Sequence, residues 1–243
     1  AGYKAHIENL VTSMDDWFRP DDVTVAPDGS LFVSDWYDGG VGGHKAEDIV
    51  RGRIYHISTK EGYKPAKLDF SSGEAASNGL LSDNMDVFYQ SWQKLHSMGE
   101  EAEPFLTKLM AKGGTAKARA LWLGAKIPTK ATTYINKAVA DKDPNFRIQG
   151  IRMARYMASD KLTDFIALVV NDSSVQVRRE AAIALKYLGN PVAAELWADL
   201  ALQHQAGDRW ELEALGIGAD QFPDLYFEAW KSTYLQSPAF RKF

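Results

Sequence analysis

The chain has 243 residues, of which 45% are apolar and 25% are charged, and its 28 basic and 32 acidic side chains give a net charge of −4. This composition is typical of a globular protein with a sizeable core, which excludes a disordered or fibrous chain. The acidic balance argues against nucleic acid as a partner, because phosphate binding requires a basic face. The longest apolar runs, such as Phe165–Val170, are too short to span a bilayer.

The sequence contains no cysteine. This excludes disulfides, thiolate zinc sites, a cysteine nucleophile and covalent haem attachment through a C-x-x-C-H motif within this chain. The chain starts at Ala1 without an initiator Met, and no charged segment followed by an apolar one marks a signal peptide. We therefore expect either that a leader has been removed or that this is an internal piece of a longer protein.

Composition changes near residue 60. Residues 1–62 hold 8 of the 19 glycines and only 4 alanines, whereas residues 101–243 hold 24 alanines. The net charge is −5 over residues 1–62 and +1 over the rest. Because Gly and Asp favour turns and Ala favours helix interiors, a β segment followed by an α segment is expected.

Short alternating stretches around a Pro-Asp-Gly-Ser turn at residues 27–30 indicate an antiparallel meander. The predicted strands are 22–26, 31–35 and 53–58, with a weaker fourth candidate at 3–11. A glycine-rich excursion, residues 38–52, separates the second strand from the third. Three or four such strands match one blade of a β-propeller.

Beyond a linker at residues 63–81, apolar-periodic segments alternate with Gly, Pro and Asn-Asp breaks. An arginine recurs at intervals of 28 to 31 residues, at Arg119, Arg147, Arg178 and Arg209. This period predicts a HEAT-like α-solenoid of four to five helix pairs over residues 82–243. We expect each arginine to pair with an acidic group of the next repeat. The predicted fold class is thus mainly α, with a small antiparallel meander at residues 1–62.

The β segment resembles a known family over Trp17–Ser58. The resemblance rests on Trp17-Phe18-Arg19-Pro20-Asp21-Asp22-Val23, on Ala26–Asp38, on Gly42-Gly43-His44 and on Arg51-Gly52-Arg53-Ile54-Tyr55. These stretches are similar to the last propeller blade of a bacterial family of membrane-bound dehydrogenase-like proteins. In that family a sugar-dehydrogenase-like propeller precedes HEAT repeats and usually a C-type cytochrome domain.

The resemblance implies that this chain is part of an exported, periplasmic oxidoreductase. It implies a quinone and haem c in the parent protein, but no cofactor in this chain. The implied partners are the other blades or domains of the same polypeptide, and the concave face of the solenoid is a candidate surface for a protein partner. Neither a membrane span nor a metal site is expected here.

The candidate cofactor-binding residues lie at the end of the second strand and in the excursion: Asp35, Asp38, His44, Arg51 and Arg53. Carboxylates at a propeller mouth suit a ligand or Ca²⁺, a histidine suits a base or metal ligand, and arginines suit an anionic substrate or a quinone. The alternative for each is structural. In it Asp35 binds turn amides, the arginines bridge Asp35, Asp38 or Asp48, and His44 is solvated. No catalytic residue is assigned.

Two classes of function remain open besides the first hypothesis, which is a non-catalytic HEAT-repeat scaffold or spacer in a propeller-type dehydrogenase. In one alternative, the Asp35–Arg53 loop contributes to the quinone or substrate site of a sugar or alcohol oxidoreductase. In the other, the helical repeats bind polysaccharide or peptide. Since a quinone site requires groups from several blades, the isolated chain is expected to be inert.

Overall fold

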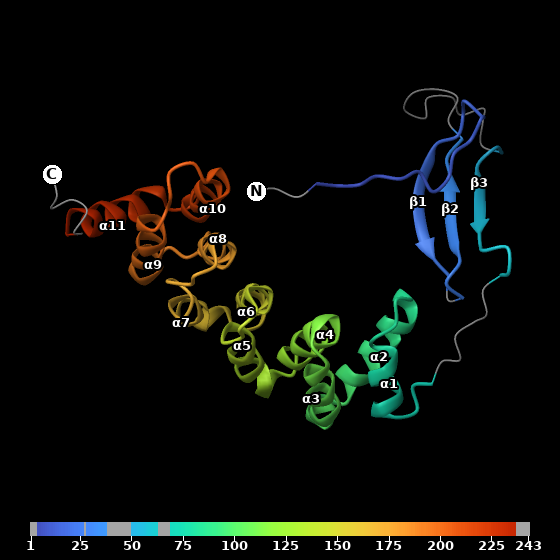
Figure 1. Ribbon diagram of the computed structural model, residues 1–243, viewed down its shortest axis with the longest axis horizontal. Helices are drawn as coiled ribbons and strands as arrows, with labels where there is room; N and C mark the ends of the chain where they lie inside the picture. The colour runs from blue at the N-terminus through green and yellow to red at the C-terminus, as the bar shows by residue number, and fades with distance from the viewer. Residues whose placement is uncertain (1–3, 27, 38–49, 63–68, 237–243) are drawn as a thin grey trace. The chain divides into compact units, whose positions relative to one another are not determined.

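The computed structural model describes residues 4–26, 28–37, 50–62 and 69–236. These are mainly helical and are preceded by one small antiparallel sheet, which confirms the predicted fold class (Figure 1). The chain divides into two compact units, unit 1 (Ala1–Ser97) and unit 2 (Met98–Phe243). Within the described ranges, no helix is long and apolar enough to cross a bilayer.

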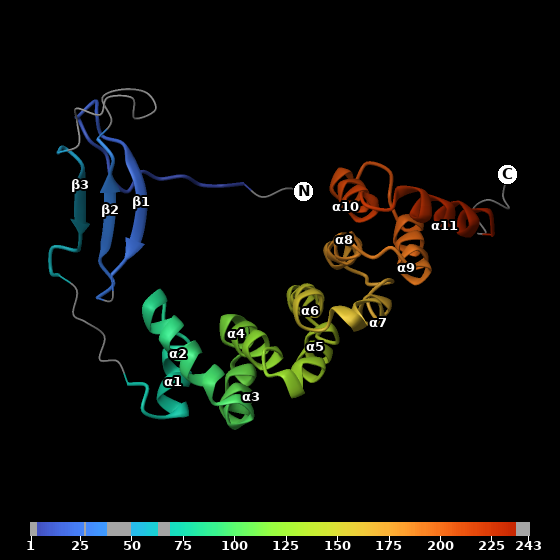
Figure 2. The ribbon, with the colours of Figure 1, turned by 180° about the vertical axis from the view of Figure 1, so that it is seen from behind.

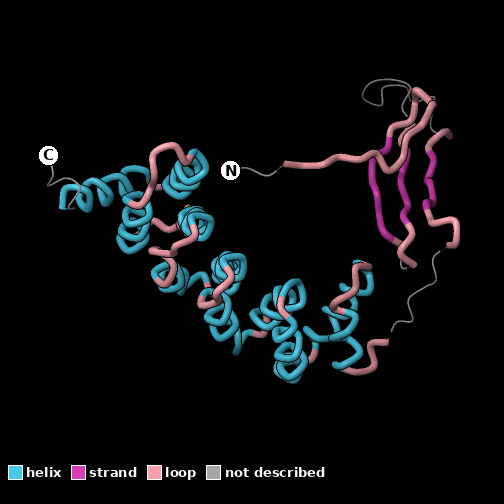
Figure 3. The backbone as a smooth tube through the Cα atoms, viewed as in Figure 1, coloured by secondary structure: helices cyan, strands magenta, loops and turns pink. Residues whose placement is uncertain are grey.

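The sheet of unit 1 has three strands in the order β1-β2-β3 (Figure 3). They are β1 (Pro20–Val25), β2 (Leu31–Asp35) and β3 (Arg53–Ile57), and both pairings are antiparallel. The three predicted strands are thus present, with boundaries shifted by one or two residues. Residues 4–11, where a fourth strand was considered, carry none.

The tight connection between β1 and β2 follows from its sequence. Gly29 has φ of 87°, a conformation that costs glycine little and other residues more. The Asp28 carboxylate accepts the backbone N–H of Ser30 at 2.9 Å, and the Ala26 N–H donates to the Ser30 carbonyl at 2.8 Å. This turn sets the register in which Val23 lies opposite Val33, and Val33 opposite Tyr55.

Unit 1 also contains two helices, α1 (Gly73–Gly79) and α2 (Met85–Ser97), which pack against each other. The Ser72 side chain accepts the Ala75 N–H and caps α1. Helix α1 lies inside residues 63–81, so the expected linker is partly helical.

Unit 2 contains nine α-helices within the described residues. They are α3 (Glu103–Lys112), α4 (Gly114–Ala125), α5 (Ala131–Val139), α6 (Pro144–Met157), α7 (Leu162–Ala167), α8 (Val175–Ala184), α9 (Pro191–Leu202), α10 (Arg209–Ala219) and α11 (Pro223–Gln236). Helices α4, α6, α8 and α10 stack in succession, and α7, α9 and α11 stack beside them (Figures 1 and 2). The unit is therefore built by repetition of one packing arrangement.

The core of unit 2 lies between successive helices. Leu121, Ile135, Ile151 and Leu185 are fully buried. Ala181, in the same helix region as Leu185, is also fully buried. The hydroxyl of buried Tyr226 donates to the carbonyls of Leu185 and Leu188 at 2.9 and 2.8 Å, and burial raises its pKa to about 12. Helix α11 is thereby attached to the end of α8.

Candidate functional site

An ionic cluster joins the end of β2 to the start of β3. Arg53 lies opposite Asp35 in the register, and its Nη2 is 2.8 Å from Asp35 Oδ2 and 3.1 Å from Asp15 Oδ2. Its Nε donates to Asp35 Oδ2 at 3.0 Å. One guanidinium is thus held between two carboxylates, and this is the ion pair that the structural alternative predicts.

Asp35 is only 2% exposed, and both oxygens of its carboxylate accept hydrogen bonds from other residues of the chain. Oδ1 accepts the backbone N–H groups of Arg19 at 2.8 Å and of Tyr37 at 3.0 Å. Burial by itself would raise the pKa of Asp35, but these hydrogen bonds and Arg53 outweigh it, so the pKa lies below its usual value. The Asp35 carboxylate therefore orders the backbone around it.

Tyr37 completes the cluster in an unusual conformation. Its φ is 51°, which is uncommon for a residue other than glycine and costs conformational energy. The Arg53 guanidinium lies 4.4 Å from the centre of the Tyr37 ring, and that of Arg51 lies 5.9 Å from it. Such cation–π contacts, with the Tyr37 N–H bond to Asp35, offset that cost.

Three of the five predicted site residues, Asp35, Arg51 and Arg53, thus come together around Tyr37. The other two, Asp38 and His44, lie outside the described residues. Asp15 belongs to the cluster but is absent from the sequence-based candidates, since nothing in its spacing, 38 residues before Arg53, indicates contact. Carboxylates and guanidinium are paired with each other, so the cluster fixes the ends of β2 and β3.

A second polar group lies at the β1–β2 turn. The Ser30 Oγ is 2.6 Å from Asp28 Oδ1 and 2.8 Å from His56 Nε2. Since the carboxylate only accepts, the single hydroxyl proton goes to Asp28, and His56 Nε2 donates to Ser30. With the hydrogen bonds running from His56 to Ser30 to Asp28, His56 does not accept the Ser30 hydroxyl proton. It therefore does not activate Ser30 as a nucleophile. The hydrogen bonds from Ser30 lower the pKa of Asp28 and stabilise the turn.

A row of cations connects the repeats of unit 2. Lys117, Arg147 and Arg178 each lie four residues after the N-cap of their helix, in α4, α6 and α8. Lys117 pairs with Asp141, Arg147 with Asp172, and Arg178 with Glu211 at 3.0 Å. We call this set the cation row. It differs from the predicted arginine series, because Arg119 and Arg209 do not occupy the equivalent positions.

The repetition extends to the backbone. Arg147 Nη1 donates to the Asp141 carbonyl at 2.8 Å, and Arg178 Nη1 donates to the Asp172 carbonyl at 2.9 Å. Burial by itself would raise the pKa of Asp172. The hydrogen bonds from Arg147 lower it and outweigh the burial, so the pKa of Asp172 lies below its usual value. These side chains hold one repeat on the next, which is a structural role.

Apolar side chains are exposed on both faces of the sheet. On the face that carries Asp35 and Tyr55, Val23 is 58% exposed. On the opposite face Ile54 is 74% exposed, and Phe32 stacks on His56 while remaining partly open to water. Antiparallel sheets commonly have one solvated polar face. In this sheet apolar area remains open on both faces, although Val33 and Asp35 of the first face are buried.

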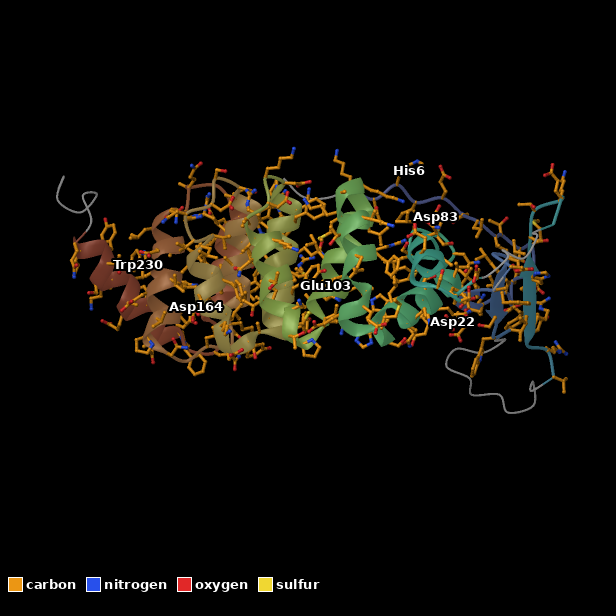
Figure 4. All side chains as sticks on the ribbon, turned by 90° about the horizontal axis from the view of Figure 1, so that it is seen from below. His6, Asp22, Asp83, Glu103, Asp164 and Trp230 are labelled. Carbon is orange, nitrogen blue, oxygen red and sulfur yellow. The ribbon has the colours of Figure 1, made fainter. Side chains whose placement is uncertain are left out.

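An apolar groove of about 740 Å³ lies among α9, α10 and α11. Its lining comprises Trp197 and Ala201 of α9, His204 just after α9, Leu212, Leu215, Gly216 and Ala219 of α10, and Pro223, Asp224, Phe227 and Trp230 of α11. Figure 4 labels Trp230 on α11, with Glu103 marking α3. We call this the terminal groove.

The side chains place limits on metal chemistry. Among the described residues, no three His, Asp or Glu side chains form a group that suits a metal ion, and the whole sequence has no cysteine. None of the clusters above therefore has the ligand set of a zinc or iron–sulfur site.

Comparison with known proteins gives one match. A family model described as a domain of unknown function (DUF7133) matches residues 2–61. No curated protein and no solved structure matches the chain significantly. The matched residues include β1, β2 and β3 and end before α1.

Proposed function

We propose that this chain is a non-catalytic interaction scaffold, in which a propeller blade is followed by HEAT-like repeats. The parent protein is then an exported, periplasmic dehydrogenase of the propeller type, with quinone and haem c bound by its other domains. The blade packs between neighbouring blades, and the repeats separate the propeller from an electron acceptor.

The observation that carries this proposal is the exposure of apolar side chains on both faces of one three-stranded sheet. Val23 on one face and Ile54 on the other are largely exposed. An isolated sheet of this size is marginal in water, and large exposed apolar patches typically mark interfaces. In a propeller, blades on both sides would cover both faces.

The polar clusters support a role without chemistry. Arg53 is shared by Asp15 and Asp35, and the cation row pairs with acids of the following repeats. A catalytic group needs a free proton-transfer or ligand position facing substrate. These side chains instead satisfy each other, which favours the scaffold over the contribution of the Asp35–Arg53 loop to a quinone site.

Sedimentation velocity of the 243-residue chain tests the interface. The isolated chain should self-associate, and a Phe32→Thr, Ile54→Thr double variant should sediment as a monomer, because threonine keeps strand propensity but removes apolar area. The matched control is Tyr156→Ser with Leu168→Ser, two exposed apolar residues of unit 2. A monomeric wild type, or equal loss of association in the control, would contradict the proposal.

Redox measurements test the absence of chemistry. The chain is mixed with sugars or alcohols, a soluble quinone and a reducible dye. The proposal predicts no dye reduction above the protein-free background. Quinone-dependent reduction that Arg53→Gln abolishes would instead establish the oxidoreductase alternative.

A further inference from the structure

We propose that the terminal groove binds an amphipathic helix of a partner protein, with apolar side chains along one stripe and Lys or Arg beside it. The inference rests on the proposed scaffold role and names the partner class for unit 2. Four observations carry the inference: the shape of the groove, Leu212 at the position that the cation row occupies in earlier helices, the exposed glycine Gly216, and the negative charge around the groove.

The groove is open because its walls pack away from each other. Helix α10 packs mainly on α8, and α11 packs mainly on α9. Leu212 and Phe227, on α10 and α11, are both more than half exposed at its edges. A groove between two helices with apolar walls is a common receptor for an amphipathic helix, whose anchors recur at i, i+3, i+4 and i+7.

In α10, which forms one wall of the groove, an apolar residue takes the position of the cation row. The position four residues after the N-cap holds Lys117, Arg147 and Arg178 in the earlier helices, but Leu212 in α10. Leu212 is 59% exposed and lines the groove. In the earlier helices this position holds a cation that pairs with an acidic residue of the following repeat. An acidic residue brought to Leu212 by a further repeat of the same kind would find no cation to pair with. Leu212 therefore suits an apolar contact instead.

Gly216 forms part of the groove floor. A glycine inside a helix costs about 1 kcal/mol relative to alanine. A Cβ at Gly216 would meet no atom within 4 Å, so packing inside the described chain gives no reason for the glycine. Close approach of another backbone does give one. Gly216 thus points to a ligand that lies directly on α10.

The surroundings carry a net negative charge. From Val175 to Gln236, the range of α8 to α11, the chain has 9 acidic and 5 basic side chains, a net charge of −4. Asp224 lines the terminal groove. The adjoining depression, which shares Leu212 and Gly216, holds Glu213 and Asp220 together with Lys186, and these acids pair with Arg209 and Lys186. Asp224 is therefore the acidic group that the groove itself presents. A cationic flank on the bound helix complements this potential and discriminates against acidic helices.

Titration of the full chain with labelled model peptides tests the inference. The probe is a helical peptide of about 18 residues, roughly 27 Å long, composed of leucine on one stripe and lysine elsewhere. The comparison peptides replace lysine with glutamate, or distribute the leucines around the helix. Fluorescence anisotropy should show saturable binding of the Leu/Lys peptide, at least about tenfold tighter than of either comparison peptide.

Variants locate the binding site. Gly216→Trp places a large side chain in the groove and should weaken binding of the Leu/Lys peptide at least about tenfold. Leu168→Trp, at an exposed position just after α7, should not weaken it. Leu212→Ser, at an exposed position that the fold does not need, should also weaken binding. Thermal unfolding checks that each variant remains folded. If Gly216→Trp does not fold, the binding measured with Leu212→Ser decides whether the groove is the binding site.

Three results would overturn the inference: no binding of the Leu/Lys peptide, equal binding of the Leu/Glu peptide, or unchanged binding in both groove variants. None of these affects the sheet interface or the redox assay. A failed titration would therefore leave the scaffold proposal standing, whereas dye reduction would refute the scaffold without involving the groove.

Discussion

The guanidinium of Arg147 forms two hydrogen bonds with the carboxylate of Asp172, at 2.5 Å from Nε to Oδ2 and 2.7 Å from Nη2 to Oδ1. Arg147 lies in α6 and Asp172 in the turn before α8. Both side chains are largely buried. This two-point, charge-assisted contact fixes the position of one repeat on the next.

Arg147→Ala should destabilise the chain by about 3–5 kcal/mol, because Asp172 would remain buried without its partner. Urea unfolding measures the loss. The matched control is Arg209→Ala, which breaks an exposed pair with Glu213 in the same helix and should change stability by less than about 0.5 kcal/mol. Equal effects of the two substitutions would show that the cation row does not hold the repeats.

Acid should unfold the chain through the same carboxylates. The pKa values of Asp35 and Asp172 are lower in the folded state than their usual value, which is about 3.9 for aspartate in unfolded chains. Their stabilisation is therefore complete above pH about 4 and is lost as the pH falls through the lower folded values. Urea midpoints measured from pH 7 to pH 2 should decline in this acidic range. Asp172→Asn should flatten the decline, and an unchanged slope would contradict the assignment.

Leu185→Ala should cost about 2–5 kcal/mol, since Leu185 is fully buried and a cavity would remain. The measurement is equilibrium unfolding in urea. Leu168→Ala, at an exposed position, is the control. A loss below about 0.5 kcal/mol at Leu185 would mean that the buried face of α8 is misplaced.

Two glycines in α10 should respond oppositely to alanine. Gly216→Ala should stabilise the isolated chain by about 0.5–1 kcal/mol, since the new methyl group meets open space. Gly218→Ala should destabilise it, because its Cβ would lie 2.4 Å from the Ala182 carbonyl oxygen. Thermal unfolding of both variants measures the contrast. Stabilisation by both would contradict the packing of α10 on α8.

Sequence patterns predict the helices and strands of this chain better than they predict its side-chain contacts. Alternation and a Pro-Asp-Gly-Ser turn locate β1 and β2, and helix breaks locate most of unit 2. The arginine period, however, mixes two helix positions. Four residues after the N-cap, α4 has Lys117 and α10 has Leu212, whereas the predicted series has Arg119 and Arg209 in these helices.

The candidate cluster shows a second limit of sequence reasoning. Asp35 and Arg53 are brought together by the register of β2 and β3, which alternation predicts in part. Asp15 reaches Arg53 from a stretch without regular structure before β1, and the left-handed conformation of Tyr37 depends on that assembly. Such contacts form only in three dimensions, so no local spacing indicates them.

Hydrogen exchange of backbone amides tests the central claim most directly, namely that the sheet is an interface element whereas the helical repeats support themselves. Both segments are measured in the same isolated chain at low concentration. The account predicts faster exchange for the amides of β2, Leu31–Asp35, than for those of Ala181–Leu185, because each face of the small sheet leaves apolar area open to water at Val23 and Ile54, while α8 is packed between neighbouring helices. Stronger protection of β2 than of Ala181–Leu185 would show an independently stable β domain and would contradict the account.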